Sequence, residues 1–152
     1  EEFEGLPHRY QYLGEFHGIR FIDDSKATSP ESAMAALNRT GSVTHWLCGG
    51  QPKGSDLSSY REITSNQPLH AYCFGEVQDS LCRTLGSAGL KANKFADLES
   101  AFAAALKQAQ AKDVILLSPG FASFDQFRSF EERGQYFQEL CREFQNRGSQ
   151  AG

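Results

Sequence analysis

Three clusters of polar residues, at residues 23–28, 49–55 and 118–123, each follow an apolar run that predicts a strand. They contain lysine, carboxylate and hydroxyl side chains, which are groups that proteins use to bind phosphates and carboxylates. In an open α/β sheet, ligands bind in the crevice outside the carboxyl ends of the strands. We therefore expect all three clusters to reach one crevice, where they could hold a small anionic molecule.

The first cluster, residues 23–28, combines two aspartates, Lys26 and two hydroxyl side chains directly ahead of a predicted helix. Ser29, Pro30 and Glu31 mark the start of that helix, since they supply a hydroxyl cap, a proline at the first helical position and an early acid. Lys26 and the free amides at the helix start could together hold an anion. An ordinary capped surface loop has the same local features, so both interpretations stay open.

The second cluster comes close to the phosphate-binding pattern G-x-x-x-x-G-K-[ST], because Gly49 and Gly54 have its spacing and Ser55 follows. However, Lys53 precedes the second glycine, so it would not start a helix beneath the phosphates. This excludes a domain that hydrolyses ATP by itself. Lys53 could still bind a carboxylate, or it could be a solvated lysine in a turn.

In the third cluster, Pro119 and Gly120 are expected to stop the preceding strand. Ser123 should lie just before a helix, where its hydroxyl could cap the helix or bind a ligand.

A further candidate pair, His8 and Arg9, adjoins the first strand and could stack on a base or approach a phosphate. A lone histidine is more often structural. The chain has no G-x-S-x-G, no H-E-x-x-H and no G-x-G-x-x-G after a strand, so hydrolases, zinc proteases and standard dinucleotide-binding enzymes lack their usual motifs.

The elements that must position these residues alternate between strands and helices. Strands are predicted at residues 10–16, 19–23, 43–48, 69–74, 91–95 and 114–117, the first two joined by a tight turn at His17 and Gly18. Helices are predicted at residues 29–37, 56–65, 78–87 and 98–109. A long terminal helix should place one apolar side toward the core, formed by Phe127, Phe130, Gly134, Phe137, Cys141 and Phe144. The alternation predicts an α/β fold with a mostly parallel sheet, one antiparallel edge strand and helices on both faces.

Length and composition indicate one folded domain spanning residues 1–152. The chain is 39% hydrophobic and 22% charged, which excludes disordered, collagen-like and coiled-coil chains. Its formal charge of -4, without a block of like charges, does not indicate a surface for nucleic acid or an anionic membrane. No apolar stretch approaches the ~20 residues of a membrane span, and the acidic start does not resemble a signal peptide, so we expect a cytoplasmic location. Because it opens without methionine, we expect the chain to be part of a longer protein.

The four cysteines, Cys48, Cys73, Cys82 and Cys141, lack C-x-x-C spacing. Cys48 and Cys73 lie inside apolar runs, where a small hydrophobic residue would serve as well. We therefore expect neither disulfides nor a metal site.

Several motifs, taken together and in order, resemble one family, the Mur ligases. They lie at residues 5–9, 24–28, 49–50 with 53–54, 117–127 and 133–134. Within the family the chain resembles the C-terminal domain of the members that add D-glutamate to UDP-N-acetylmuramoyl-L-alanine in peptidoglycan synthesis. The resemblance covers nearly the whole chain and implies a Rossmann-like sheet with one antiparallel strand, in agreement with the pattern above.

The resemblance implies a three-domain enzyme. Its N-terminal domain would hold the UDP-sugar and its central domain ATP and Mg²⁺, and neither domain is present in this sequence. The family's reaction uses ATP to activate the substrate carboxylate as an acyl phosphate, which the amine of the amino acid then attacks. The C-terminal domain, which this chain resembles, would close over that site and exclude water.

The resemblance also implies roles for individual residues. His8 and Arg9 match positions near the nucleotide, and Asp24 matches the acid that contacts the ribose. Lys26 matches the lysine near the phosphate and the activated carboxylate, which implies a catalytic role. The positions that receive D-glutamate are matched by Thr28, Lys53, Ser123 and Phe130. Phe130 could equally be a core residue.

The chain departs from the family's pattern at Ser29, where Asn is common, and at Pro52, where an acid is frequent. In addition, Gly120 and Phe121 replace a small residue followed by Cys. These departures concern the choice of amino acid more than the reaction class. Two alternatives therefore stay open: a sister ligase that adds another amino acid, and a non-catalytic Rossmann-like binding module.

Overall fold

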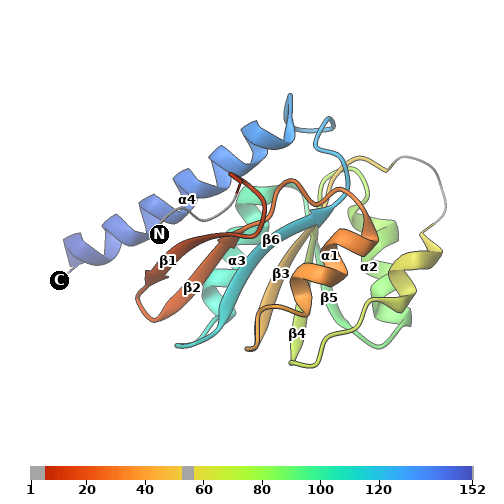
Figure 1. Cartoon of the computed structure of the whole chain (residues 1–152), viewed down its shortest axis with the longest axis horizontal. Helices are drawn as coiled ribbons and strands as arrows, with labels where there is room; N and C mark the ends of the chain where they lie inside the picture. The colour runs from red at the N-terminus through yellow and green to blue at the C-terminus, as the bar shows by residue number, and fades with distance from the viewer. Residues whose placement is uncertain (1–5, 53–56, 152) are drawn as a thin grey trace.

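The computed structural model describes residues 6–52 and 57–151, with side chains described up to residue 147. These residues form a six-stranded sheet with helices packed against it (Figure 1). The strands are β1 (Gln11–Phe16), β2 (Ile19–Asp23), β3 (Thr44–Gly49), β4 (Leu69–Phe74), β5 (Lys91–Phe95) and β6 (Val114–Gly120). The helices are α1 (Pro30–Leu37), the short 3-10 helix η1 (Ser58–Glu62), α2 (Gln78–Ser87), α3 (Leu98–Gln108) and α4 (Phe130–Ala151).

The strand order is β1-β2-β6-β3-β4-β5, with β1 antiparallel to β2 and every other neighbouring pair parallel. The turn between β1 and β2 places both His17 (φ 55°) and Gly18 (φ 83°) in the left-handed region, as a two-residue hairpin requires. The predicted mostly parallel sheet with one antiparallel edge strand is confirmed.

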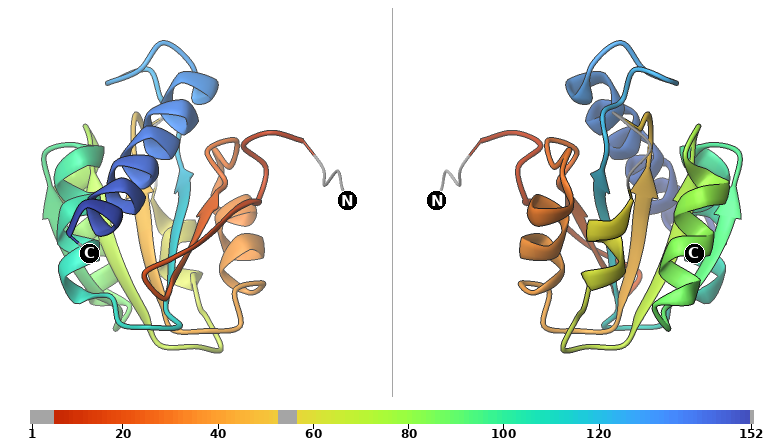
Figure 2. Two further views of the ribbon diagram at one scale, coloured as in Figure 1. Left: turned by 90° about the vertical axis from the view of Figure 1, so that its left-hand side faces the viewer. Right: turned by 90° about the vertical axis from the view of Figure 1, so that its right-hand side faces the viewer.

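Helices cover both faces of the sheet, also as predicted (Figure 2). One core cluster lies under α1, η1 and α2, and the other lies under α3 and α4. Adjacent residues of β3 divide between them, since Trp46 packs into the first cluster and Leu47 into the second. A strand buried on both faces needs a continuous apolar run, which explains the pattern at residues 43–48.

The helix predicted at residues 56–65 is wrong in length and type, although residue 56 itself lies outside the described residues. The structure has only η1, followed by extended backbone at Ile63. The apolar residues here, Leu57, Tyr60 and Ile63, recur every three positions and all contact the core cluster under α1. That period matches the three residues per turn of a 3-10 helix instead of the 3.6 of an α-helix.

The prediction that Pro119 and Gly120 stop the strand is also wrong, because β6 continues through Gly120. The register between β3 and β6 shifts after Leu47, and Gly49 pairs with Gly120 beyond the shift. Such an irregularity accommodates a proline, which has no N–H to donate. The Gly120 N–H instead donates to the carbonyl of Ala27, 2.8 Å away.

The terminal helix begins at Phe130, so Phe127 precedes it, contrary to the prediction. Its first turn is capped by Ser129, whose hydroxyl accepts a hydrogen bond from the Glu132 N–H (3.0 Å). Phe127 nevertheless packs against the core cluster under α3 and α4, where Phe137 is fully buried. The apolar pattern therefore identified core residues correctly but not the start of the helix.

All four cysteines are free. Cys48 and Cys73 are buried at directly paired positions of β3 and β4, with sulfur atoms 4.0 Å apart. Of the helices within the described part of the chain, none combines the length and apolar character needed to cross a membrane.

Candidate functional site

The loops that follow β2, β6 and β3 meet at the carboxyl edge of the sheet. The Asp24 N–H donates to the carbonyl of Leu117 (2.7 Å), and the Gln51 N–H donates to the carbonyl of Ala122 (2.9 Å). The chain leaves β2 and β3 toward α1 and η1 on one face, but leaves β6 toward α4 on the other. Because the connections diverge here, the edge has the topology at which α/β proteins bind ligands.

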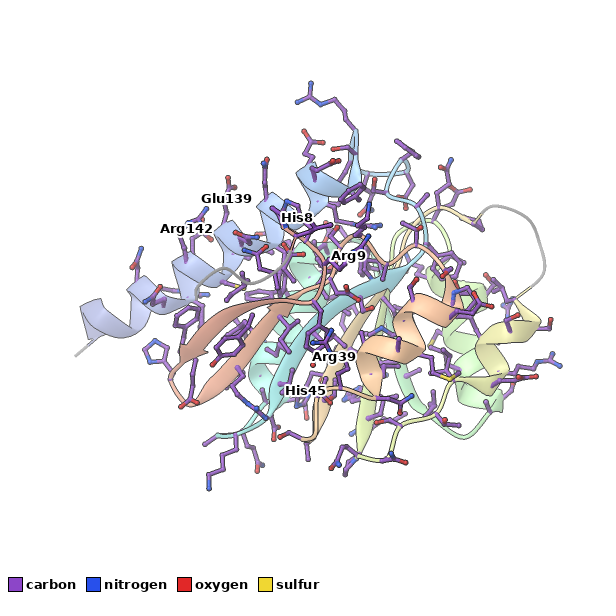
Figure 3. The ribbon with its side chains drawn as sticks, viewed as in Figure 1. His8, Arg9, Arg39, His45, Glu139 and Arg142 are labelled. Atoms are coloured by element: carbon purple, nitrogen blue, oxygen red, sulfur yellow. The ribbon has the colours of Figure 1, made fainter. Side chains whose placement is uncertain are left out.

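A cavity of about 440 Å³ opens between the segment ahead of β1 and helix α1. Arg9, Lys26 and Arg39 line it together with one carboxylate, that of Asp24. The guanidinium carbon of Arg39 lies 3.8 Å from the ring centroid of Tyr10, which also lines the cavity. Figure 3 shows Arg9 and Arg39 between the opening hairpin and α1. Three cations beside one carboxylate favour an anionic ligand.

Asp24 is largely buried, although it lines this cavity. Its Oδ1 accepts the N–H of Tyr10 (2.8 Å), and its Oδ2 accepts the hydroxyl of Ser118 (2.7 Å). Burial raises the pKa of this carboxyl, against the lowering effect of these two hydrogen bonds. A carboxylate can accept about four hydrogen bonds, so Asp24 could also accept hydroxyl groups of a sugar.

Lys26 lines the same cavity and lies against the first residue of α4. Its Nζ is 4.6 Å from the ring centroid of Phe130, and its backbone N–H donates to the carbonyl of His8 (3.0 Å). A cation over an aromatic face is attracted by the ring without being neutralised. Lys26 could therefore keep its charge for an anionic ligand.

His8 does not line the cavity that Arg9 and Lys26 share. It is buried, and its Nδ1 lies 2.7 Å from Oδ2 of Asp23, which is fully buried. The ring also makes an edge-on contact with Phe130, at 6.2 Å between centroids. These contacts tie the segment before β1 to the start of α4.

Thr28 and Ser123 lie at the same edge of the sheet but outside that cavity. Thr28 is half-buried between β2 and α1, and Ser123 is buried. The carbonyl of Ser123 accepts the N–H groups of Gln126 and Phe127, so the residue closes a turn ahead of α4 without capping the helix. Lys53 lies outside the described residues.

The structure adds two residues that the sequence analysis did not assign, Ser25 and Arg133. The Arg133 side chain is fully buried and donates to both the hydroxyl and the carbonyl of Ser25. A signal existed in the sequence, because Arg133 lies three residues after Phe130 and four before Phe137, on the apolar side of α4. A charged residue on such a side needs a buried partner.

Metal ligands are not assembled by this part of the protein. Within residues 6–52 and 57–151, no group of three or more His, Cys, Asp or Glu side chains could hold a metal ion.

Comparison with known proteins places the chain in a family. The family described as "Mur ligase, glutamate ligase domain" matches residues 8–121. A UDP-N-acetylmuramoylalanine--D-glutamate ligase from Chlamydia abortus is 43% identical over 143 residues, covering 94% of this chain and 34% of the relative. The enzyme of the same name from Pasteurella multocida is 38% identical, covering 93% and 32%. The chain thus spans about a third of the length of these relatives.

Solved structures share the fold at low sequence identity. A bifunctional folylpolyglutamate synthase/dihydrofolate synthase from Yersinia pestis, complexed with AMPPNP and Mn ion, has a TM-score of 0.60 at 22% identity, covering 90% of this chain and 32% of that one. A domain attributed to a UDP-N-acetylmuramate:L-alanyl-gamma-D-glutamyl-meso-diaminopimelate ligase from Haemophilus ducreyi has a TM-score of 0.63 at 17% identity, covering 90% of this chain and 99% of that one. With most of its residues matched by the family description above, the chain belongs to the Mur ligase family, in its glutamate ligase domain.

Proposed function

We propose that this chain is the C-terminal domain of a three-domain ligase that uses ATP to join D-glutamate to UDP-N-acetylmuramoyl-L-alanine in the cytoplasm. The names of the relatives and their greater length support this assignment. All 152 residues would form one lid-like domain that receives the amino acid. The N-terminal UDP-binding domain and the central ATPase domain would lie elsewhere in the longer protein.

In the proposed reaction, the carboxylate of the UDP-linked substrate attacks the terminal phosphorus of ATP and ADP leaves. The amine of D-glutamate then attacks the acyl carbon, an amide bond forms and phosphate leaves. The acyl phosphate would be hydrolysed in water, so a domain that closes over the site protects it and orients the amine.

The observation that carries the proposal is that Arg9, Asp24 and Lys26 line one cavity at the carboxyl edge of the sheet. Arg9 would approach the nucleotide, the carboxylate of Asp24 would accept ribose hydroxyls, and Lys26 would offset negative charge on the transferred phosphoryl group and the activated carboxylate. His8 would lie near the nucleotide, and the contact of its Nδ1 with Oδ2 of Asp23 would fix the segment that carries Arg9.

On the amino-acid side, D-glutamate carries two carboxylates and must present an unprotonated amine. Lys53 would bind one carboxylate, and the hydroxyls of Thr28 and Ser123 would donate neutral hydrogen bonds. Phe130 would contribute its backbone and its ring, against which Lys26 lies.

ATP suits the lining of the cavity, because three cations face one carboxylate there. Mg²⁺ lacks a comparable set of oxygen ligands among the described residues, so the central domain would hold it. When bound, Mg²⁺ would offset phosphate charge. The residues of this chain would hold the ribose and orient the carboxylate and amine.

Two observations would test the proposal. The reading frame upstream of Glu1 should encode G-x-x-x-x-G-K-[ST], the phosphate-binding loop that this chain lacks. In ¹⁵N–¹H spectra of this chain, an ATP analogue should shift the amides of Arg9 and Lys26, and D-glutamate those of Thr28 and Ser123. Selective shifts with a different amino acid would indicate a sister ligase. Absence of the upstream loop would indicate a non-catalytic binding module.

A further inference from the structure

The side chain of Arg133 on α4 is hydrogen-bonded to Ser25, which lies in the loop after β2. The two residues are 108 positions apart in the sequence. The Nε of Arg133 donates to the hydroxyl oxygen of Ser25 (3.0 Å), and one terminal nitrogen of Arg133, Nη2, donates to the carbonyl of Ser25 (2.8 Å). The two bonds come from one planar guanidinium, which fixes their relative direction.

Every polar group of Ser25 is bound. Its N–H donates to Oδ1 of Asp23 (3.0 Å), and its hydroxyl, besides accepting from Arg133, donates to the carbonyl of Phe130 (2.8 Å). Ser25 lies between Asp24 and Lys26, both of which line the proposed nucleotide cavity. Hydrogen bonds from Ser25 to Asp23, Phe130 and Arg133 therefore fix the backbone that carries these two side chains.

The same contacts join this loop to the start of α4. Phe130, whose carbonyl accepts the Ser25 hydroxyl, carries the ring against which Lys26 Nζ lies. Arg133 is one helical turn further along α4. The β2 loop and the first turn of α4 therefore form one unit, and it contains the proposed catalytic lysine.

Stability alone does not account for an arginine at this place. Its side chain is fully buried, and its other terminal nitrogen, Nη1, has no hydrogen-bond partner in the described structure. Burial lowers the pKa of Arg133 to about 10, against the nearby charges of Asp125 and Asp23. Replacing a complete buried ion pair by apolar side chains is often neutral or stabilising, so the burial of a charge is weak evidence for a role in stability. What an apolar side chain could not do is bind Ser25.

The unpaired Nη1 of Arg133 lies close to the end of β3. A Cβ added to Gly50, which follows β3, would lie 3.3 Å from Nη1 and would overlap the carbonyl of Ala122. The guanidinium thus lies between the loops after β2, β3 and β6, which carry the three polar clusters.

We propose that Arg133 is a positioning residue for the ligase reaction: through Ser25 it holds the backbone that presents Lys26 and Asp24. This inference rests on the proposed function. Because Arg133 would set the position of the Lys26 side chain, replacing Arg133 should lower kcat more than it raises the KM for ATP or D-glutamate.

The test uses the full-length enzyme that contains this domain. Arg133→Met removes both bonds to Ser25 at similar side-chain length, Arg133→Lys retains a cation and a donor, and Ser25→Ala removes the hydroxyl partner. Arg128→Met is the matched control, because Arg128 precedes the same helix but has a side chain that is 91% exposed. Thermal melting of each variant measures folding separately from activity.

We expect Arg133→Met to lower kcat by roughly 30-fold or more, Arg133→Lys to recover at least about a third of wild-type kcat, and Arg128→Met to leave kcat within about twofold. Ser25→Ala should lower kcat by itself but add less than about twofold to Arg133→Met, because the two residues act as a unit. If Arg133→Met does not fold, the lysine and Ser25 variants provide the same comparison.

Folded Arg133→Met with wild-type kcat would overturn the inference while leaving the proposed function intact. So would a loss from Ser25→Ala that adds in full to that of Arg133→Met, because it would show that the two residues do not act as a unit. An inactive wild-type enzyme would instead overturn the proposed function.

Discussion

The imidazole of His8 occupies the space that a side chain at position 134 would fill. A Cβ added to Gly134 would overlap Nδ1 of His8 and would lie 2.9 Å from Oδ2 of Asp23. The glycine in the second turn of α4 therefore allows the segment before β1 to reach the buried carboxylate at the end of β2. Gly134 thus contributes to the site through its missing side chain, although it carries no chemical group of its own.

Gly134→Ala should lower the free energy of unfolding by about 1–3 kcal/mol, because overpacking of the His8–Asp23 contact exceeds the gain in helix propensity. Gly86→Ala is the control, since Gly86 lies inside α2 with no atom within 4 Å of its added Cβ. Gly86→Ala should raise the free energy of unfolding by about 0.5–1 kcal/mol. Urea denaturation measures both, and equal effects at the two positions would contradict the packing explanation.

Lys26→Met should lower the turnover of the full-length ligase by roughly 100-fold or more, since it removes the positive charge proposed to face the transferred phosphoryl group. Lys107→Met changes an exposed lysine on α3, on the other face of the sheet, and should leave turnover within about twofold. Steady-state kinetics compare the two. A Lys26 variant with wild-type kcat would remove the proposed catalytic role.

Asp24→Asn should change how stability depends on pH. Because burial raises the pKa of Asp24, the folded protein binds this proton more tightly than the unfolded chain does, and stability falls as the pH rises through the raised pKa. Asparagine does not titrate. The free energy of unfolding of the variant, relative to wild type, should therefore increase between about pH 4 and about pH 8 in urea denaturation.

Asp79→Asn is a control, because its effect on stability should change with pH in the opposite direction. A hydrogen bond from Lys94, together with the charge of Arg83, lowers the pKa of the exposed Asp79 carboxyl. The stability from this carboxylate is present above its unfolded pKa and is lost as the pH falls through the folded pKa. The variant should therefore lose stability relative to wild type as the pH rises. The same slope for both substitutions would mean that Asp24 is not destabilised by burial.

His45→Leu should lower the free energy of unfolding by about 1–3 kcal/mol, because it leaves the buried hydroxyl of Tyr72 without this partner and removes a hydrogen bond to the half-buried Asp113. His45 bonds to the hydroxyl of Tyr72 (2.8 Å) and to Oδ2 of Asp113 (2.9 Å) at the edge of the sheet opposite the site. His70 is its direct partner on β4 and bonds to Asn93 near the surface. His70→Leu should cost less than about 1 kcal/mol, and a larger loss there than at His45 would contradict this account of the network.

Much of the fold could be predicted because its signals are local. The β1–β2 turn at His17 and Gly18, the Ser29 cap of α1 and the apolar stripe of α3 all depend on residues within a few positions of one another. Errors arose where local patterns were ambiguous. The apolar period of three at η1 also fits a short α-helix. Ser123, which by sequence could cap a helix or bind a ligand, closes a turn, and Ser129 caps α4.

The sequence by itself determined most of the element types, the family resemblance and the location of each polar cluster at the carboxyl end of a strand. It also singled out Arg9, Asp24 and Lys26, which line one cavity, and the roles assigned to these residues and to Lys53 stay predictions. Only the tertiary structure placed β6 between β2 and β3, and so brought the clusters to one edge. It also paired Arg133 with Ser25. The physical reason is that periodicity and capping act over a few residues, whereas strand order and buried hydrogen bonds join residues a hundred positions apart, whose proximity no local pattern encodes.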